Sequence, residues 1–274
     1  MRVWVNGELF DEADATVSVF DHGVTVGDGV FESTRVTAGL PFALTRHLRR
    51  LAGSARGLGL PEPDDELVRG AVAQTLAAND LTGSLRLRIT YTGGVSPLGS
   101  DRGAAEPTLV VALAPLSPWP LTAHVAVVPW TRNEGGATSG LKTTSYADNV
   151  VALAHAKRAG AGEALFANTR GELCEGTGSN VFLVLDGRVA TPPLSSGCLA
   201  GVTRALLLEW CDVEERVLPL PALQEASEVF LSSSTRDVQA VSAVDGRELP
   251  DAPGSLTRQV AETFARRAAA DPDP

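Results

Sequence analysis

Cysteine, histidine and lysine are scarce in this sequence, and their scarcity limits the chemistry that it can support. The three cysteines, Cys174, Cys198 and Cys211, are odd in number and no two have the spacing of metal ligands, so they are interpreted as reduced thiols. The four histidines are scattered along the 274 residues, and no metal site is expected. Only two of the 23 basic side chains are lysines, Lys142 and Lys157, and the other 21 are arginines. A reaction that requires a lysine therefore has two candidates.

Long hydrophobic runs and net positive charge are also missing. No run of 18 or more apolar residues occurs, so no membrane span is expected. The first residues lead into a strand and a turn without the apolar core of a signal peptide, which favours a cytoplasmic location. The formal net charge is -10, and because phosphate backbones repel an acidic protein, nucleic-acid binding is not expected.

The hydrophobic pattern predicts a mixed α+β fold in two parts. In the first part, strands are expected at residues 30–36, 41–44, 84–92 and 108–114, and helices at residues 45–58 and 64–78. Thr45 is the predicted N-cap of the first of these helices. Residues 116–120 contain two prolines and a serine, a composition typical of a linker.

The second part follows this linker. Strands are expected at residues 123–128, 163–167, 180–185 and 228–231, and helices at residues 148–159, 202–210 and 253–269. The tail, residues 271–274, is expected to be disordered. We therefore predict a small N-terminal domain at residues 1–115, a linker at 116–122 and a large C-terminal domain at 123–274. A cleft between two such domains is the usual place for a ligand.

Lys142 is the stronger of the two lysine candidates. It follows Gly140 and Leu141 at the end of a loop rich in small residues, just before a predicted helix. A lysine with a lowered pKa can attack an aldehyde and form an imine, although a solvated surface charge is an equally frequent role. Lys157 lies near the end of a predicted helix, where a cation interacts favourably with the helix dipole and faces water.

Acidic and glycine-rich segments supply further candidates. Glu175 lies between a predicted strand and a glycine turn, where it is either an exposed turn residue or a carboxylate that keeps a pyridine nitrogen protonated. Residues 201–204 begin a predicted helix, whose amide groups suit a phosphate or simply start a helix. Arg50 follows Arg46 and Arg49, and either all three are solvated or Arg50 turns inward onto a phosphate.

Two arginines lie on one face of a predicted strand. Arg86 and Arg88 alternate with Leu85, Leu87 and Ile89, so the arginines share one face and the apolar residues the other. Paired arginines can bind a substrate carboxylate, but the solvent face of a half-buried sheet is the more common place for them.

Together, and in this order, these segments resemble the class IV aminotransferases, which are the fold type IV pyridoxal-phosphate (PLP) enzymes. The group contains branched-chain and D-amino-acid aminotransferases, (R)-amine transaminases and 4-amino-4-deoxychorismate lyase. The resemblance extends over nearly the whole chain. The matching segments are residues 27–32, 47–51, 140–142, 175–182, 199–204 and 232–237.

The resemblance implies two α/β domains with PLP at their interface, and a role for each matching residue. Lys142 would hold PLP as an imine and serve as base and acid, while Glu175 would pair with the pyridine nitrogen. Five further residues would bind the PLP phosphate, the last two also touching the substrate carboxylate: Arg50, Val202, Thr203, Ser234 and Thr235. A homodimer is also implied, because active sites of this family take residues from a neighbouring subunit.

The implied reaction is a ping-pong transamination between an amino acid and an α-keto acid through aldimine and ketimine intermediates. The usual carboxylate-binding residues are missing. Phe31 stands where D-amino-acid aminotransferases have tyrosine, and residues 98–100 lack their Arg-x-His. Residues 85–89 lack the Tyr-x-Arg of the branched-chain enzymes. We predict that Arg86, Arg88 or Arg236 replaces these contacts around Phe31, and that D-amino acids are favoured, because the chain length and the missing branched-chain motif are closer to that group.

Three alternatives remain. The first is a branched-chain L-amino-acid aminotransferase. The second is 4-amino-4-deoxychorismate lyase, in which the same lysine drives pyruvate loss in folate biosynthesis, although that enzyme often has two threonines where this chain has Glu32 and Ser33. The third is a PLP-binding protein without activity, which the presence of Lys142, Glu175 and Arg50 disfavours.

Overall fold

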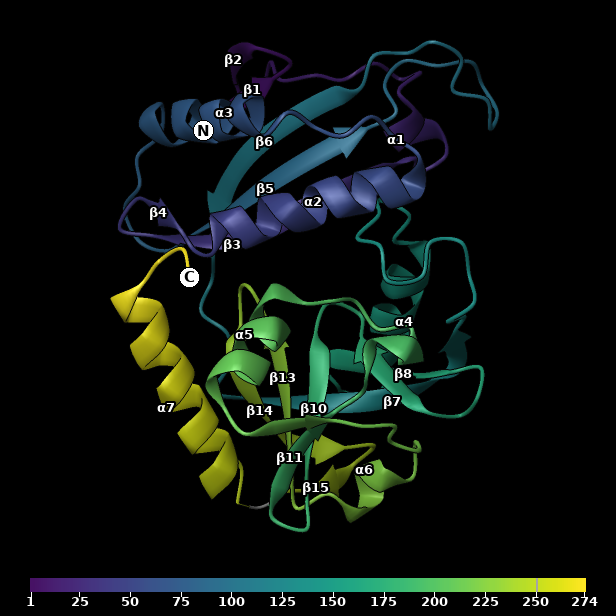
Figure 1. Cartoon of the computed structure of the whole chain (residues 1–274), viewed down its shortest axis with the longest axis vertical. Helices are drawn as coiled ribbons and strands as arrows, with labels where there is room; N and C mark the ends of the chain where they lie inside the picture. The colour runs from purple at the N-terminus through teal and green to yellow at the C-terminus, as the bar shows by residue number, and fades with distance from the viewer. Residues whose placement is uncertain (250) are drawn as a thin grey trace. The chain divides into compact units, whose positions relative to one another are not determined.

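Two short segments from the C-terminal half of the sequence, Leu141–Tyr146 and Pro272–Pro274, pack with Met1–Ser117 in one structural unit. The second unit comprises Pro118–Gly140 and Ala147–Asp271. These units come from a computed structural model that describes residues 1–249 and 251–274 (Figure 1). The predicted domains were continuous in sequence, whereas the units are not. The division into domains at 1–115 and 123–274 stays a prediction.

The first unit contains a six-stranded antiparallel sheet with the strand order β2-β1-β6-β5-β3-β4. The strands are β1 (Arg2–Val5), β2 (Glu8–Asp11), β3 (Gly29–Thr37), β4 (Leu40–Pro41), β5 (Leu85–Thr92) and β6 (Thr108–Pro115). The helices are α1 (His22–Thr25), α2 (Leu44–Leu58) and α3 (Asp65–Ala77).

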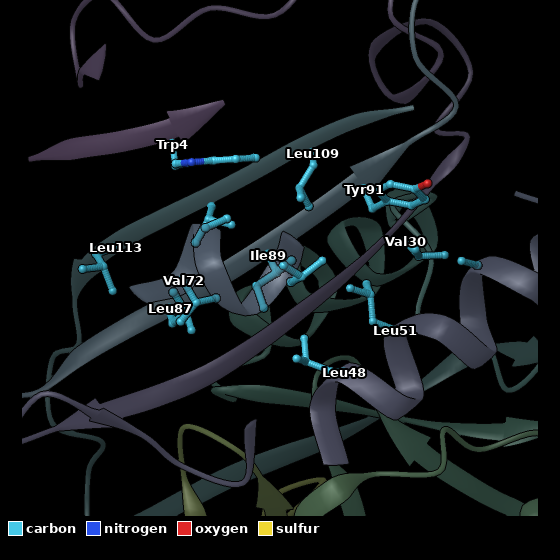
Figure 2. Close-up of a cluster of buried hydrophobic side chains, with 14 of the residues drawn as sticks. Trp4, Val30, Leu48, Leu51, Val72, Leu87, Ile89, Tyr91, Leu109 and Leu113 are labelled. Atoms are coloured by element: carbon cyan, nitrogen blue, oxygen red, sulfur yellow. The ribbon is translucent and has the colours of Figure 1, made fainter. Parts of the chain in front are cut away.

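Strict alternation along β5 gives this sheet two different faces. Leu85, Leu87 and Ile89 are at most 3% exposed, whereas Arg86 and Arg88 are exposed on the opposite face, as predicted. The apolar face packs against α2 and α3. Figure 2 shows this core, with Leu48 and Leu51 of α2 and Val72 of α3 near Leu87 and Ile89. Burying each such side chain contributes about 1.5–3 kcal/mol. The core therefore fixes α2 on the sheet.

The start of α2 differs from the prediction. The N-cap is Ala43, not Thr45, and its backbone is left-handed with a φ of 53°. Thr45 lies one residue inside the helix, so its hydroxyl cannot cap the first turn in the usual way. In α3, by contrast, Asp64 is the N-cap and accepts a hydrogen bond from the Leu67 amide at 2.8 Å.

The second unit is built on a mixed nine-stranded sheet with the order β12-β11-β10-β13-β14-β7-β8-β9, and β15 pairs with β14. Strands β7 and β8, β7 and β14, and β11 and β12 are parallel. The strands are β7 (Thr122–Arg132), β8 (Glu163–Asn168), β9 (Leu173–Gly176), β10 (Asn180–Leu185), β11 (Arg188–Thr191), β12 (Val213–Glu215), β13 (Glu228–Ser233), β14 (Asp237–Val244) and β15 (Arg247–Glu248).

The central strands of this sheet are buried on both faces. All six residues of β8 and of β10 are buried, and Phe182 of β10 stacks on Phe230 of β13 with ring centroids 4.6 Å apart. Two small residues of helix α4, Ala152 and Ala156, pack closely against the sheet. The helices are α4 (Ala147–Arg158), α5 (Val202–Trp210), α6 (Ala222–Glu225), α7 (Ser255–Ala270) and the 3-10 turn η1 (Leu194–Ser196).

The predicted helices at residues 45–58, 64–78, 148–159, 202–210 and 253–269 are confirmed to within two residues at each end. The prediction of a disordered tail is wrong, because Pro272–Pro274 is hydrogen-bonded to α2. The three cysteines are free thiols. No helix in the described parts of the chain combines the length and the apolar character needed to cross a membrane.

Candidate active site

The backbone of Lys142 is held by the first unit. The Phe31 amide of β3 donates a hydrogen bond to the Lys142 carbonyl at 3.0 Å, and the Thr144 amide donates to the Gly29 carbonyl at 2.8 Å. The Lys142 amide donates to Ser54 Oγ of α2 at 3.2 Å. The lysine segment therefore extends the sheet at the start of β3 and is tied to α2.

Side chains on either side of Lys142 reinforce this position. The hydroxyls of Thr144 and Ser145 both donate to the Gly27 carbonyl, at 2.8 and 2.9 Å. On α2, a Cβ atom at Gly57 would lie 2.7 Å from Leu141 Cδ2, so the missing side chain lets Leu141 pack against the helix. The backbone of Lys142 is therefore held in place by contacts of the residues before and after it in the sequence.

Aromatic rings surround the Lys142 amine. Nζ lies 4.2 Å from the ring centroid of Phe31 and 5.8 Å from that of Tyr146, and these two rings meet edge to face with centroids 5.2 Å apart. The Arg88 guanidinium lies over the same Phe31 ring, at 3.8 Å. Cations over aromatic faces are attracted by the ring quadrupole, so Phe31 helps to position both basic groups.

Arg88 is a cation suited to bind an anion. Its Nε donates to Thr90 Oγ1 at 3.1 Å, and no carboxylate of residues 1–249 or 251–274 pairs with it. Although the residue as a whole is exposed, partial burial of the guanidinium lowers the pKa of Arg88, while Tyr146 raises it and Arg86 lowers it further. A partly desolvated guanidinium gains strongly from a bidentate carboxylate.

The opposite face of β3 carries a buried ion cluster of Glu32, His47 and Arg50. Arg50 donates to the Glu32 carboxylate from Nε at 2.8 Å and from Nη2 at 2.7 Å, and His47 Nδ1 lies 2.6 Å from Oε2. Burial raises the pKa of Glu32, but the charges and hydrogen bonds of Arg50 and His47 outweigh it and bring the value to about 2. Burial lowers the pKa of His47. Glu32 therefore stays ionised and fixes the Arg50 side chain.

In the second unit, Glu175 lies on β9 with both oxygens engaged. The Leu199 amide donates to Oε2 at 2.9 Å, and Arg132 Nε lies 3.4 Å from Oε1. The Arg132 guanidinium stacks over the Phe166 ring at 4.1 Å and donates to Asn149. Its positive charge stabilises the ionised form of Glu175, and the stack keeps it in place.

The N-terminus of α5 has the features of a phosphate site. Gly201 is the N-cap, and a Cβ atom there would lie 2.0 Å from Asn180 Oδ1, so only glycine fits. Val202 and Thr203 follow as the first helical residues and are buried. Thr203 is 1% exposed, and its Oγ1 has no hydrogen-bond partner in the described structure. A buried, unpartnered hydroxyl beside helix N–H groups is what an anionic oxygen would satisfy.

The remaining predicted residues lie at the tip of the β13–β14 hairpin. Ser234, Thr235 and Arg236 form its turn, between the paired residues Ser233 and Asp237. The Arg236 side chain is held within the second unit. It donates to the fully buried Glu163 at 2.5 Å and to Gln239 at 3.1 Å, and stacks over Trp119 at 4.1 Å.

The predicted site residues thus form several sets. Lys142, Phe31 and Arg88 lie together. Arg86 lies on the same strand as Arg88, and Arg50 belongs to the cluster of Glu32. Several supporting residues were not predicted from the sequence: Glu32, His47, Ser54, Arg132 and Glu163. Glu32 had one detectable signal, because a carboxylate at an inward position of an alternating strand requires buried partners.

Known proteins resemble this chain along nearly its whole length. The sequence profile of the family described as "Amino-transferase class IV" matches residues 29–244. A Methanocaldococcus jannaschii protein assigned to the branched-chain-amino-acid aminotransferases is 34% identical, over 96% of this chain and 95% of that protein. A bifunctional aminodeoxychorismate lyase / D-amino acid transaminase of Mycobacterium tuberculosis is 32% identical, over 97% of this chain and 96% of that protein. The crystal structure of a branched-chain aminotransferase from Thermoproteus uzoniensis matches with a TM-score of 0.91 at 29% identity, covering 97% of this chain and 94% of that one.

Proposed function

The chain belongs to the class IV aminotransferases, PLP-dependent enzymes of fold type IV, and we propose that it is a transaminase that prefers D-amino acids. One observation supports the site most strongly. The Lys142 amine and the Arg88 guanidinium contact the same Phe31 ring, at 4.2 and 3.8 Å. A reactive amine and a carboxylate-binding cation are therefore within reach of one small amino acid.

The residues present fit PLP. The buried, unpartnered Thr203 hydroxyl and the Gly201 turn suit its phosphate, for which Arg50, Val202, Ser234 and Thr235 are the other proposed ligands. When bound, PLP supplies an electron sink that stabilises negative charge at the substrate α-carbon.

Lys142 is the proposed covalent anchor and proton carrier. Its Nζ removes the proton from the substrate α-carbon as a base and donates it as an acid later in the reaction. The backbone hydrogen bonds to Phe31 and Ser54 limit how far this amine can move. Such preorganisation lowers the cost of reaching the reactive geometry.

Glu175 is the proposed partner of the pyridine nitrogen. An ionised carboxylate at this position keeps a proton on that nitrogen. Arg132, 3.4 Å from one carboxylate oxygen, favours the ionised state, and the Leu199 amide orients the other oxygen. Arg132 is therefore a positioning residue for Glu175.

Arg88 is the proposed ligand of the substrate carboxylate. Of the three candidate arginines, Arg236 is already neutralised by Glu163 within its own unit. Arg86 is paired with Arg35, four residues along β3 from Phe31, whereas Arg88 lies over the Phe31 ring. Breaking the buried pair of Arg236 to bind a substrate would leave Glu163 without its counterion. Arg88 has no such competing partner in the described chain.

Preference for D-amino acids rests on sequence likeness and on the missing Tyr-x-Arg of the branched-chain enzymes. The 32% identity to a protein named as a bifunctional aminodeoxychorismate lyase / D-amino acid transaminase supports it. A branched-chain activity is the second candidate, because a relative of that name is 34% identical.

A half-reaction tests the proposal. The PLP-loaded protein is mixed with D-alanine and, separately, with L-leucine, and the conversion of the cofactor to pyridoxamine phosphate is followed by absorption. Conversion by D-alanine alone is expected. Conversion by L-leucine alone would establish the branched-chain activity instead. No conversion by either, with pyruvate released from aminodeoxychorismate without an amino acceptor, would make the chain a lyase.

We also propose a homodimer in the cytoplasm. On the first unit, Val19 and Leu98 are each 73% exposed and Phe20 is 51% exposed. Their segments adjoin, because the Ser96 amide donates to the Phe20 carbonyl at 3.2 Å. Apolar side chains gathered on a surface favour contact with another protein surface. Light scattering during gel filtration measures the mass, and a monomer would contradict the proposal.

A further inference from the structure

Helix α2 begins without the groups that normally stabilise a helix N-terminus. Its N-cap, Ala43, has no side-chain acceptor, and no acidic residue lies in the first turn. The first two turns instead contain four basic side chains: Arg46, His47, Arg49 and Arg50. The N-terminal end of a helix carries partial positive charge and unpaired N–H groups, so this arrangement alone is unfavourable.

The segment Pro272–Pro274 supplies what α2 lacks. The Pro272 carbonyl accepts a hydrogen bond from the Ala43 amide at 2.7 Å. The Asp273 carboxylate accepts one from the Thr45 amide at 2.8 Å and one from the Thr45 hydroxyl at 2.6 Å. Arg46 Nε donates to the main-chain oxygen of Pro274 at 2.7 Å. The tail thus adds a negative charge and several acceptors at the basic end of the helix.

We infer that Asp273 is a positioning residue for the cofactor phosphate, because from a distant point in the sequence it supplies the side-chain acceptor that the N-cap of α2, Ala43, lacks. Asp273 lies 228 residues after Thr45. An aspartate is among the best N-cap residues, because its carboxylate accepts from the second or third helical amide. The Thr45 amide occupies the second helical position, which matches that geometry.

The effect reaches the site through α2 itself. Arg50 is five residues beyond Thr45 on this helix, and Ser54, which accepts the Lys142 amide, is four residues further. A frayed first turn would loosen the helix backbone that carries Arg50, whose side chain is proposed to bind the PLP phosphate. This step rests on the proposed function, whereas the cap itself does not.

Hydrogen exchange tests the cap without any cofactor. In the apoprotein, Asp273→Ala is expected to speed exchange of the Thr45 amide by about fivefold, the size of a typical N-cap contribution. Asp273→Asn keeps a side-chain acceptor and should restore slow exchange. Asp212→Ala, an exposed aspartate after α5, is the matched control and should leave α2 unchanged. Unchanged Thr45 exchange in Asp273→Ala would overturn the inference.

Cofactor binding tests the link to the phosphate. Dissociation constants are measured for PLP and for pyridoxal, which lacks the phosphate group. Asp273→Ala should weaken PLP about threefold to fivefold, part or all of the cap contribution, and leave pyridoxal unchanged. Equal weakening of both compounds, or of neither, would overturn the positioning role. If the unmodified chain bound no PLP, the proposed function would fail, and hydrogen exchange would still decide whether Asp273 caps α2.

Discussion

Arg50 donates two hydrogen bonds to the Glu32 carboxylate, from Nε at 2.8 Å and from Nη2 at 2.7 Å, and Glu32 is only 1% exposed. The carboxylate lies on the face of β3 that otherwise faces the hydrophobic core, the face that also carries Val30 and Val36. Burying a charge there is costly unless it is paired and hydrogen-bonded. Glu32 and Arg50 therefore depend on each other.

Replacing Glu32 with glutamine should destabilise the protein by about 3 kcal/mol, because Arg50 and His47 lose their buried counterion. Urea denaturation of the apoprotein measures the free energy of unfolding. Glu62→Gln is the control. Glu62 is paired with Arg56 on the surface with 57% of its side chain exposed, and its replacement should cost less than about 1 kcal/mol. Equal costs for the two variants would contradict the role assigned to Glu32.

The same carboxylate predicts how stability depends on pH. The pKa of Glu32 is lowered from 4.5 to about 2, so its stabilising effect is complete above pH 4.5 and is lost as the pH falls towards 2. The lowered pKa of His47 acts in the same direction, beginning below its usual 6.5. The difference in unfolding free energy between the unaltered chain and Glu32→Gln should therefore shrink between pH 4.5 and 2. A constant difference over this range would refute the assignment.

Lys142 should be the one site of covalent cofactor attachment. Borohydride treatment of the PLP-loaded protein, followed by peptide mapping, is expected to find the added mass on the peptide that contains Lys142. Lys142→Ala should carry no adduct and show no transamination, whereas Lys157→Ala should behave like the unaltered protein. The test is unusually clean because the chain has only these two lysines. An adduct on Lys157 would show that the wrong lysine has been assigned.

Arg88→Ala should raise the apparent KM for amino-acid substrates about 10- to 100-fold, as expected for one charge-assisted hydrogen-bond partner. Arg86→Ala, on the same face of β5, is the matched control and should change KM little. Arg236→Ala should instead lower the free energy of unfolding, because the buried Glu163 would lose its counterion. A large KM effect at Arg236 or Arg86 and none at Arg88 would move the carboxylate site to the other arginine.

Arg132→Met should reduce kcat about tenfold, since Glu175 would lose the neighbouring charge that favours its ionised form. The pH dependence of the cofactor absorption should shift together with kcat, which a purely structural defect would not produce. Arg170→Met removes a surface arginine that pairs with Glu134 and Glu172, and serves as the control. An unchanged absorption titration in Arg132→Met would argue against the link.

Local pattern was sufficient for much of the fold. The alternation around Arg86 and Arg88 predicted both faces of β5, and Asp64 predicted the start of α3. Short strands such as β11 and β12 escaped prediction, because three or four residues are too few to establish a period. The predicted cap at Thr45 failed because α2 is capped by Asp273, and no local pattern reveals a partner so far away in the chain.

The candidate site was predictable only in part for the same reason. Lys142 and Glu175 lie in segments that resemble a known family, so their identity could be read from the sequence. Their supports could not. Ser54, Arg132 and Glu163 are ordinary residues in sequence, and they gain a role only from the side chains that the fold brings to them.

The attachment of Lys142 to β3 and α2 has a consequence for dividing the protein. A cut after Ser117 would leave one fragment with the edge of β3 but without its lysine. The other fragment would hold the lysine without Phe31 and Ser54, which fix its backbone. Neither half is a self-sufficient module. An exchange of halves between related enzymes would have to transfer Leu141–Tyr146 together with Met1–Ser117. Otherwise the lysine segment would pack against β3 and α2 residues of a different protein.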